Sequence, residues 1–171
     1  KTEEITIKNN RNQDAYFEIE NLLAEFVILE EPVFRLGPGE SKKIEITFIA
    51  RGNAVPELNP GKLIIKSGGS QKEVLISVEV ESAGILLDLE AEILQDYKKI
   101  LPGTEILSEI RGFNLGDSVV RRSVLMEYIV RNYEGEEIVR ETESLDIGIQ
   151  ETVTKKIDIP QDVKLGRYVF Y

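Results

Sequence analysis

The 171-residue sequence contains no cysteine, no histidine and no tryptophan. Without cysteine the chain has no disulfides and no thiolate nucleophile, and without histidine it has no Ser-His-Asp or Cys-His catalytic arrangement. Zinc sites built from these two residue types are excluded as well. The lack of cysteine does not identify a compartment, because a cytosolic protein and a disulfide-free secreted domain share this feature.

Positive charge is also scarce, since 21 Lys and Arg residues stand against 31 Asp and Glu residues and give a net charge of −10. An acidic surface repels phosphate backbones and anionic lipid headgroups, so nucleic acid is not predicted as a partner. No hydrophobic run approaches the roughly 18 residues of a membrane-spanning helix. No signal peptide is visible, although a chain that opens on Lys1 leaves a removed leader open.

Alternation of apolar and polar residues is the dominant pattern that is present. In the segment 41–48, Ile44, Ile46 and Phe48 share one face, and the residues between them are polar. Strict alternation rich in β-branched residues is typical of strands with one buried face. The same pattern recurs in the segments 72–80, 87–93, 124–130 and 153–159.

Turn-forming residues separate these segments at short intervals. Glycine supplies positive φ, proline presets φ, and asparagine and aspartate tolerate the left-handed region. Many short strands divided in this way indicate antiparallel sandwiches, so we predict an all-β fold. Only the segment 21–26 has helical character, and we expect at most a turn or two there. The expected turns lie at 9–12, 37–39, 59–61, 68–69, 102–103, 114–117 and 134–135.

The pattern of strands restarts once, after the polar and small residues 81–84. A short joint of this kind between two complete strand sets indicates a domain boundary. We therefore predict two tandem β-sandwich domains, residues 1–82 and 83–171. A Pro-Gly turn launches an alternating strand in both halves, at Pro38 and at Pro102, which suggests that the two sandwiches are related.

The first half resembles an immunoglobulin-like domain repeated in archaeal and bacterial cell-surface proteins. The resemblance lies in the stretches "ITIKNNRNQDAYFEIE", "FVILEEPVFRLGPGESKKIEITFIA" and "NPGKLIIKSGGSQKEVLISVEVES". Their common features are a turn near Asn10 to Asp14, a corner at Phe34 to Glu40 and a hairpin and closing strand at Gly68 to Val80. The family normally has a further strand before the one at Glu4, so the resemblance implies a first sandwich that lacks its first strand.

The second half is similar to a related adhesion or spacer sandwich of the same proteins, through "ILPGTEILSEIRGFNLGD", "MEYIVRNYEGEEI" and "LGRYVFY". Its final strand still alternates at Tyr171, so we expect that strand to be truncated. These are turn and corner motifs and specify a fold, not a reaction. The resemblance implies an exported protein, often anchored by a membrane helix outside this segment.

Two groups of acidic and amide side chains are candidates for calcium binding. In the segment 87–93, Leu87, Leu89, Ala91 and Ile93 are expected on the buried face, opposite Asp88, Glu90 and Glu92. These acids, together with Glu81, could form an interdomain calcium site, and "FNLGD" offers oxygen ligands from Asn114 and Asp117. Only one carboxylate lies in "FNLGD", so we favour a simple turn there, and a solvated strand face for the acids.

The segment 51–61, "RGNAVPELNPG", is the longest irregular stretch and the predicted place for a binding loop, with Arg51, Asn53, Val55 and Leu58 as candidate contacts. Four aromatic residues could stack on carbohydrate, although alternation favours the core for them: Tyr16, Tyr128, Tyr168 and Phe170. Gly68 and Gly69 fall in a hairpin with no helix after it, so no phosphate-binding cofactor site is predicted.

Taken together, the sequence predicts a non-enzymatic extracellular spacer or adhesion segment of a larger, membrane-anchored cell-surface protein. One alternative is a binding module for a glycan or a partner protein, including self-association in which an open strand edge accepts a strand from a neighbouring subunit. The other alternative is an accessory domain of an exported hydrolase. No cofactor is expected on any of these hypotheses.

Overall fold

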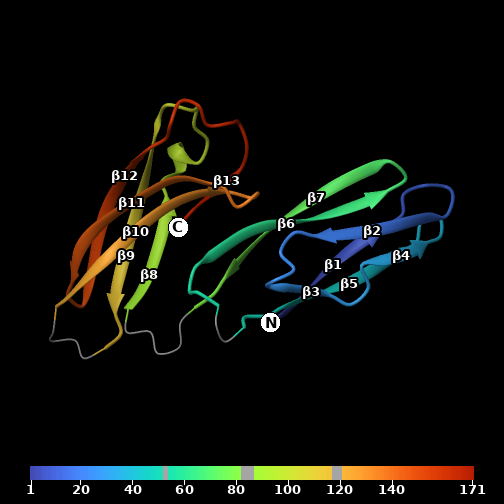
Figure 1. The fold of residues 1–171 in the computed structure, drawn as a ribbon, viewed down its shortest axis with the longest axis horizontal. Helices are drawn as coiled ribbons and strands as arrows, with labels where there is room; N and C mark the ends of the chain where they lie inside the picture. The colour runs from blue at the N-terminus through green and yellow to red at the C-terminus, as the bar shows by residue number, and fades with distance from the viewer. Residues whose placement is uncertain (52–53, 82–86, 117–120) are drawn as a thin grey trace. The chain divides into compact units, whose positions relative to one another are not determined.

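The structure is a computed structural model that describes residues 1–51, 54–81, 87–116 and 121–171. The chain divides into two compact units, Lys1–Glu81 and Ser82–Tyr171. All strand pairs in the described residues are antiparallel (Figure 1), and the only helical element among them is the single 3-10 turn η1 (Gln95–Tyr97). The predicted all-β class is confirmed. The described part of the chain contains no helix with the length and hydrophobicity that crossing a bilayer requires.

Unit 1 consists of two antiparallel sheets. One has the order β1-β5-β3, and the other has the order β4-β2-β6-β7. The strands of the first sheet are β1 (Thr2–Lys8), β5 (Ser41–Phe48) and β3 (Val27–Leu29). The strands of the second sheet are β4 (Val33–Leu36), β2 (Ala15–Asn21), β6 (Leu58–Ser67) and β7 (Ser70–Glu79).

The core of unit 1 takes alternate side chains from both sheets. Ile44 and Ile46 of β5 are buried, whereas Glu45 between them is exposed. From the other sheet, the rings of Phe17 and Phe34 stack with their centroids 5.5 Å apart. These residues belong to one apolar cluster that draws on β1, β2, β3, β4, β5, β6 and β7. The alternation read from the sequence therefore identifies the buried face of this unit.

A buried asparagine fastens the turn after β1 to the corner before β5. The side-chain amide of Asn9, which is 1 % exposed, donates to the carbonyl oxygens of Gln13 (2.8 Å), Leu36 (3.1 Å) and Gly37 (2.9 Å). Its side-chain oxygen accepts the backbone N–H of Arg11 at 3.0 Å. Both polar atoms of this amide group therefore have hydrogen-bond partners within the fold.

The two Pro-Gly turns singled out in the sequence both precede strands. Gly39 and Gly103 have φ values of 72° and 78°, in the left-handed region that glycine enters without a steric penalty. After these turns β5 begins at Ser41 and β9 at Glu105. The segment after β2 forms a hydrogen-bonded turn, in which the backbone N–H of Phe26 donates to the carbonyl of Leu23, so the helical character expected for 21–26 is limited to that turn.

Unit 2 likewise consists of two antiparallel sheets. Each has three strands, in the orders β12-β9-β8 and β11-β10-β13. Its apolar cluster joins them through Ile106 and Ile110 of β9, Ile157 of β12, and Tyr128 and Val130 of β10. The strands are β8 (Leu87–Ile93), β9 (Glu105–Asn114), β10 (Arg122–Asn132), β11 (Glu137–Ile147), β12 (Gln150–Asp158) and β13 (Tyr168–Phe170). Each unit thus has a β-sandwich-like architecture with its own core.

The apolar face predicted for the strand at 87–93 is not buried along its whole length. The strand exists as β8, but Leu89 is 49 % exposed and Ala91 is also exposed. The reason lies in the facing sheet, where β13 is short and pairs only with the last three residues of β10, Val130 to Asn132. Ile93, at the end nearest β13, is partly buried. The prediction was therefore correct for the strand and wrong for the burial of Leu89 and Ala91.

Truncating either core tests the two clusters. Ile46→Ala in unit 1 and Tyr128→Ala in unit 2 should each lower the free energy of unfolding by about 2 to 5 kcal/mol, because both side chains are buried and would leave cavities. Leu125→Ala, on β10 but 69 % exposed, is the control and should change stability by no more than about 0.5 kcal/mol. Equilibrium denaturant unfolding measures all three, and equal effects at Leu125 and Tyr128 would contradict the assigned core.

Replacing Asn9 tests the contribution of its side-chain hydrogen bonds to stability. Asn9→Ala should cost about 1 to 3 kcal/mol, because it leaves buried carbonyl groups without their donor. Asn10→Ala, at the exposed neighbouring position, should have little effect on unfolding. Similar midpoint shifts for the two variants would show that the hydrogen bonds of Asn9 contribute nothing to stability.

Candidate functional site

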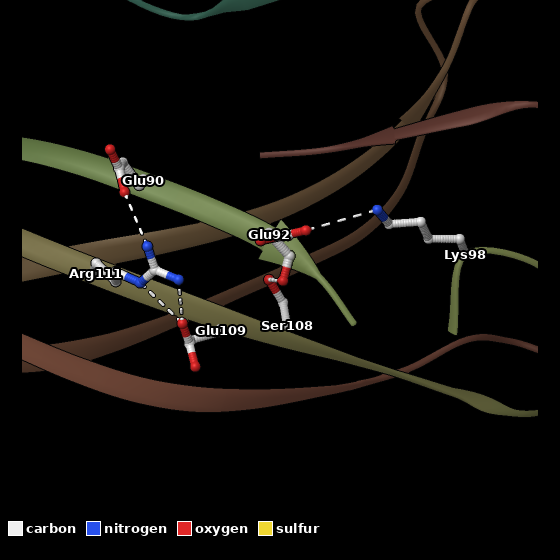
Figure 2. Close-up of polar contacts among 6 residues, drawn as sticks. All are labelled: Glu90, Glu92, Lys98, Ser108, Glu109 and Arg111. Atoms are coloured by element: carbon white, nitrogen blue, oxygen red, sulfur yellow. Dashed lines mark hydrogen bonds and ion pairs between the residues drawn. The ribbon is translucent and has the colours of Figure 1, made fainter. Parts of the chain in front are cut away.

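The acidic residues proposed for calcium binding on β8 are exposed, and two of the three contact basic side chains. Glu90 lies opposite Arg111 on β9, and its carboxylate accepts from Nη1 of Arg111 at 3.4 Å. The same guanidinium donates to Glu109 through Nε at 2.8 Å and Nη2 at 2.6 Å (Figure 2). Glu92 lies 3.7 Å from Nζ of Lys98, and the carboxylate of Asp88 accepts the N–H of Leu89 at 2.9 Å.

This arrangement places positive charge where a calcium ion would have to sit. The hydrogen bond to Glu109 raises the pKa of Arg111 above its ordinary value, so the guanidinium stays charged between the two carboxylates. Among the described residues, no group of three or more acidic, histidine or cysteine side chains is placed to hold a metal ion. Glu81, the remaining member of the proposed interdomain site, belongs to unit 1. That site stays a prediction.

The side chain of Asn114 in "FNLGD" is turned toward its own backbone. Asn114 ends β9 and is buried, and its side-chain oxygen accepts the N–H of Gly116 at 3.0 Å. Its backbone N–H donates to the carbonyl of Ile149 at 3.0 Å. This side-chain-to-backbone bond is the geometry of a turn that ends a strand. Asp117 lies outside the described residues.

The proposed binding loop is shorter than the sequence suggests. Arg51 and Val55 are exposed, with Val55 at 68 %, and Asn53 lies outside the described residues. Leu58 is not in the loop, because it begins β6 and pairs with Glu79 of β7. The turn predicted at 59–61 is wrong, because these residues lie within β6; Pro60 fits there because the pairing of β6 with β2 covers only residues 63–66. A proline is tolerated where a strand lacks a partner on one side.

The four candidate stacking aromatics do not form one surface. Tyr16 is exposed on β2 of unit 1, where the guanidinium of Arg35 lies 5.9 Å from its ring centroid. Tyr128 is 2 % exposed and belongs to the core of unit 2. Only Tyr168 and Phe170 share a surface feature, since both line a cavity at one end of unit 2.

A polar network between the sheets of unit 2 was not identified from the sequence. The hydroxyl of Tyr128 donates to Glu143 of β11 at 2.5 Å. Nζ of Lys155 on β12 lies 2.9 Å from Glu143, 3.2 Å from Glu141 and 4.5 Å from the centroid of the Tyr128 ring. The signal that marks it is Lys155 itself, which occupies an inward position between Val153 and Ile157 of an alternating strand.

The pKa shifts in this network hold its members in their usual charge states. Burial and the hydrogen bond to Glu143 raise the pKa of Tyr128 well above its ordinary value. Burial alone would lower the pKa of Lys155, but its bonds to Glu143 and Glu141 outweigh burial and raise it. The bonds from Tyr128 and Lys155 lower the pKa of Glu143. The network therefore joins β12 of one sheet to β10 and β11 of the other through charged and hydrogen-bonded side chains.

A cavity of about 580 Å³ opens at the end of unit 2 where η1, β13 and the segment between β12 and β13 meet. Figure 1 shows the red segment after β12 and the turn η1 at the same end of this unit. Its lining includes four basic residues, Lys98, Lys99, Lys164 and Arg167. Among the described residues, no acidic residue lines it. This feature cannot be read from the sequence, because its lining comes from several strands and from loops without periodicity.

The network of Tyr128, Glu143 and Lys155 predicts a pH-dependent contribution to stability. Because the folded-state pKa of Glu143 is lowered from its ordinary value of 4.5, its contribution is present above that value and is lost as the pH falls through the folded-state pKa. Glu143→Gln should therefore be less stable than the wild type at pH 7, and the difference should shrink in acid.

The matched control is Glu151→Gln. Glu151 lies on β12 with Lys155 and has no ion-pair partner among the described residues. Denaturant unfolding between pH 3 and pH 7 measures both variants. A Glu143→Gln effect that stays constant across this range, or that Glu151→Gln reproduces, would contradict the role assigned to the network.

The chain matches no protein-family model and no curated protein sequence.

Proposed function

We propose that the chain is a non-catalytic structural or adhesion segment of a larger cell-surface protein, built from two tandem immunoglobulin-like β-sandwiches. The observation that carries this proposal is that each unit closes its own apolar core between two sheets. A module that holds other domains at a distance needs independent folding and no reactive centre. The glycan-binding, strand-exchange and hydrolase-accessory hypotheses stay as alternatives.

The order of the strands supports an immunoglobulin-like assignment for unit 2. In such sandwiches strands A, B, E and D form one sheet and strands C, F and G the other, with C′ added beside C in variable-type domains. The order β8-β9-β12 matches A-B-E, and β11-β10-β13 matches C′-C-F. Sequence order and sheet order agree under this assignment for all six strands.

Unit 1 supports the same assignment with a different set of strands. The order β1-β5-β3 matches B-E-D, and β2-β6-β7 matches C-F-G. The additional strand β4 pairs with β2 at the position of C′, although it follows β3 in the chain. This correspondence agrees with the expectation, from the resemblance, of a first sandwich that lacks strand A.

The distribution of charge supports a structural role. On the outer faces, ion pairs join neighbouring strands: Lys43 with Glu4 at 2.7 Å, Lys66 with Glu20 at 2.6 Å, and Arg140 with Glu127 at 2.9 Å. Exposed pairs of this kind contribute only about 0 to 1 kcal/mol each. They do, however, place opposite charges at diagonal positions on neighbouring strands, and mismatched pairings would lose this complementarity.

Stretching the full chain from its two ends tests this proposal. Two separate unfolding events are expected, one for each unit, and each should lengthen the chain by roughly 250 Å, since a released residue spans at most about 3.6 Å. Ile46→Ala should lower the force of one event and Tyr128→Ala that of the other. A single event, or variants that weaken both events equally, would contradict two independent structural modules.

A further inference from the structure

The end cavity of unit 2 has the size of a small-molecule site and an apolar floor. Pockets for small ligands usually enclose about 300 to 1,000 Å³, and this one encloses about 580 Å³. Its floor is the end of the unit 2 core, because Ile106 and Val130 belong both to the buried cluster and to the lining. Ile93, Ile159 and Phe170 continue this apolar surface.

Aromatic side chains contribute to the walls, and one of them is held in place. The ring of Tyr168 lines the cavity, and its hydroxyl donates to the carbonyl of Lys164 at 2.6 Å. This bond ties the segment between β12 and β13 to the strand that follows it. Tyr97 and Tyr133 line the cavity from η1 and from the turn after β10. The walls are therefore formed by elements that the fold fixes.

The rim of the cavity is positively charged in a chain whose net charge is −10. Lys99, Lys164 and Arg167 line it, and none of these three forms an ion pair with a residue that the structure describes. The fourth cation, Lys98, reaches only the exposed Glu92 at 3.7 Å. Asp96 and Asp162 lie in the same segments but not in the lining.

Several cations without ion-pair partners in the described residues therefore gather around one apolar cavity. Many other basic side chains, such as Lys43, Lys66 and Arg140, pair with carboxylates across strands. Like charges gathered beside an apolar, low-dielectric surface repel one another, and an anion placed among them relieves that repulsion. Two exposed leucines, Leu101 and Leu165, add apolar surface at the mouth. The positive rim and the apolar floor of the cavity therefore both favour a ligand that combines a negative charge with an apolar body.

We propose that the end cavity of unit 2 binds a small amphipathic anion, with its apolar body against Ile106, Val130 and Phe170 and its acid group at Lys99, Lys164 and Arg167. A neutral molecule of the same shape gains only the apolar contacts. A cation of the same shape meets repulsion at the rim. This binding activity goes beyond the structural role proposed above and does not depend on it.

Three probes that share an eight-carbon chain separate these contributions. Titration calorimetry of the full chain with octanoate, octanol and octyltrimethylammonium, all below their micelle-forming concentrations, compares an anion, a neutral molecule and a cation. Octanoate is expected to bind about tenfold or more tightly than octanol, and the cation more weakly than either. Equal affinity for octanoate and octanol, or preference for the cation, would overturn the proposal.

Charge-reversal variants locate the binding. Lys164→Glu combined with Arg167→Glu should weaken octanoate binding about tenfold or more and leave octanol binding nearly unchanged. Both positions are exposed, so the fold should be retained, which the thermal midpoint checks. The control is Arg121→Glu, an exposed residue next to the opposite end of β10. If Arg121→Glu weakens octanoate binding equally, the effect is one of general surface charge and the cavity assignment fails.

Anionic vesicles distinguish a soluble ligand from a membrane surface. The exposed leucines beside lysines could also contact a bilayer, so vesicles that contain phosphatidylserine form the last arm of the experiment. Octanoate binding that the double variant removes supports the proposal whether or not vesicles bind. Sedimentation of the chain with vesicles, without detectable octanoate binding, would replace the cavity with a membrane-docking surface and overturn the proposal.

Discussion

Alternate burial along paired strands is the constraint on which the rest of this structure depends. In β5 and β9 every second side chain enters the space between two sheets, and the residues between them face outward. Because the period is two, a register shift of one residue would exchange the two faces of a strand. Burial of Ile44 and Ile46 in unit 1, and of Ile106 and Ile110 in unit 2, therefore fixes the register of their sheets.

Two buried or inward-pointing polar residues connect parts of the fold that the apolar cores alone do not join. Asn9 is buried, but all its hydrogen-bonding groups are satisfied by the turns on either side of it. Lys155 points inward, but two glutamates and the ring of Tyr128 compensate its charge. Burying either group without partners would cost several kcal/mol. Both connect distant segments of the chain.

The placement of cations differs between two parts of unit 2. Along the strands, Arg111 and Arg140 form ion pairs with carboxylates. At the end near β13, Lys99, Lys164 and Arg167 line an apolar cavity instead. The proposed spacer role and the proposed ligand binding are therefore compatible, because they use different surfaces of the same unit.

Local patterns in the sequence determined the strands and turns, since side-chain alternation and the backbone freedom of glycine act within a few residues, as at Ile44, Ile46 and Gly39. Tertiary structure decided the features that depend on distant partners. Leu58 joined a strand because β7 pairs with it, and Leu89 stayed exposed because β13 is short. The end cavity forms where segments far apart in the chain come together, and no periodic pattern within one segment of the sequence indicates this.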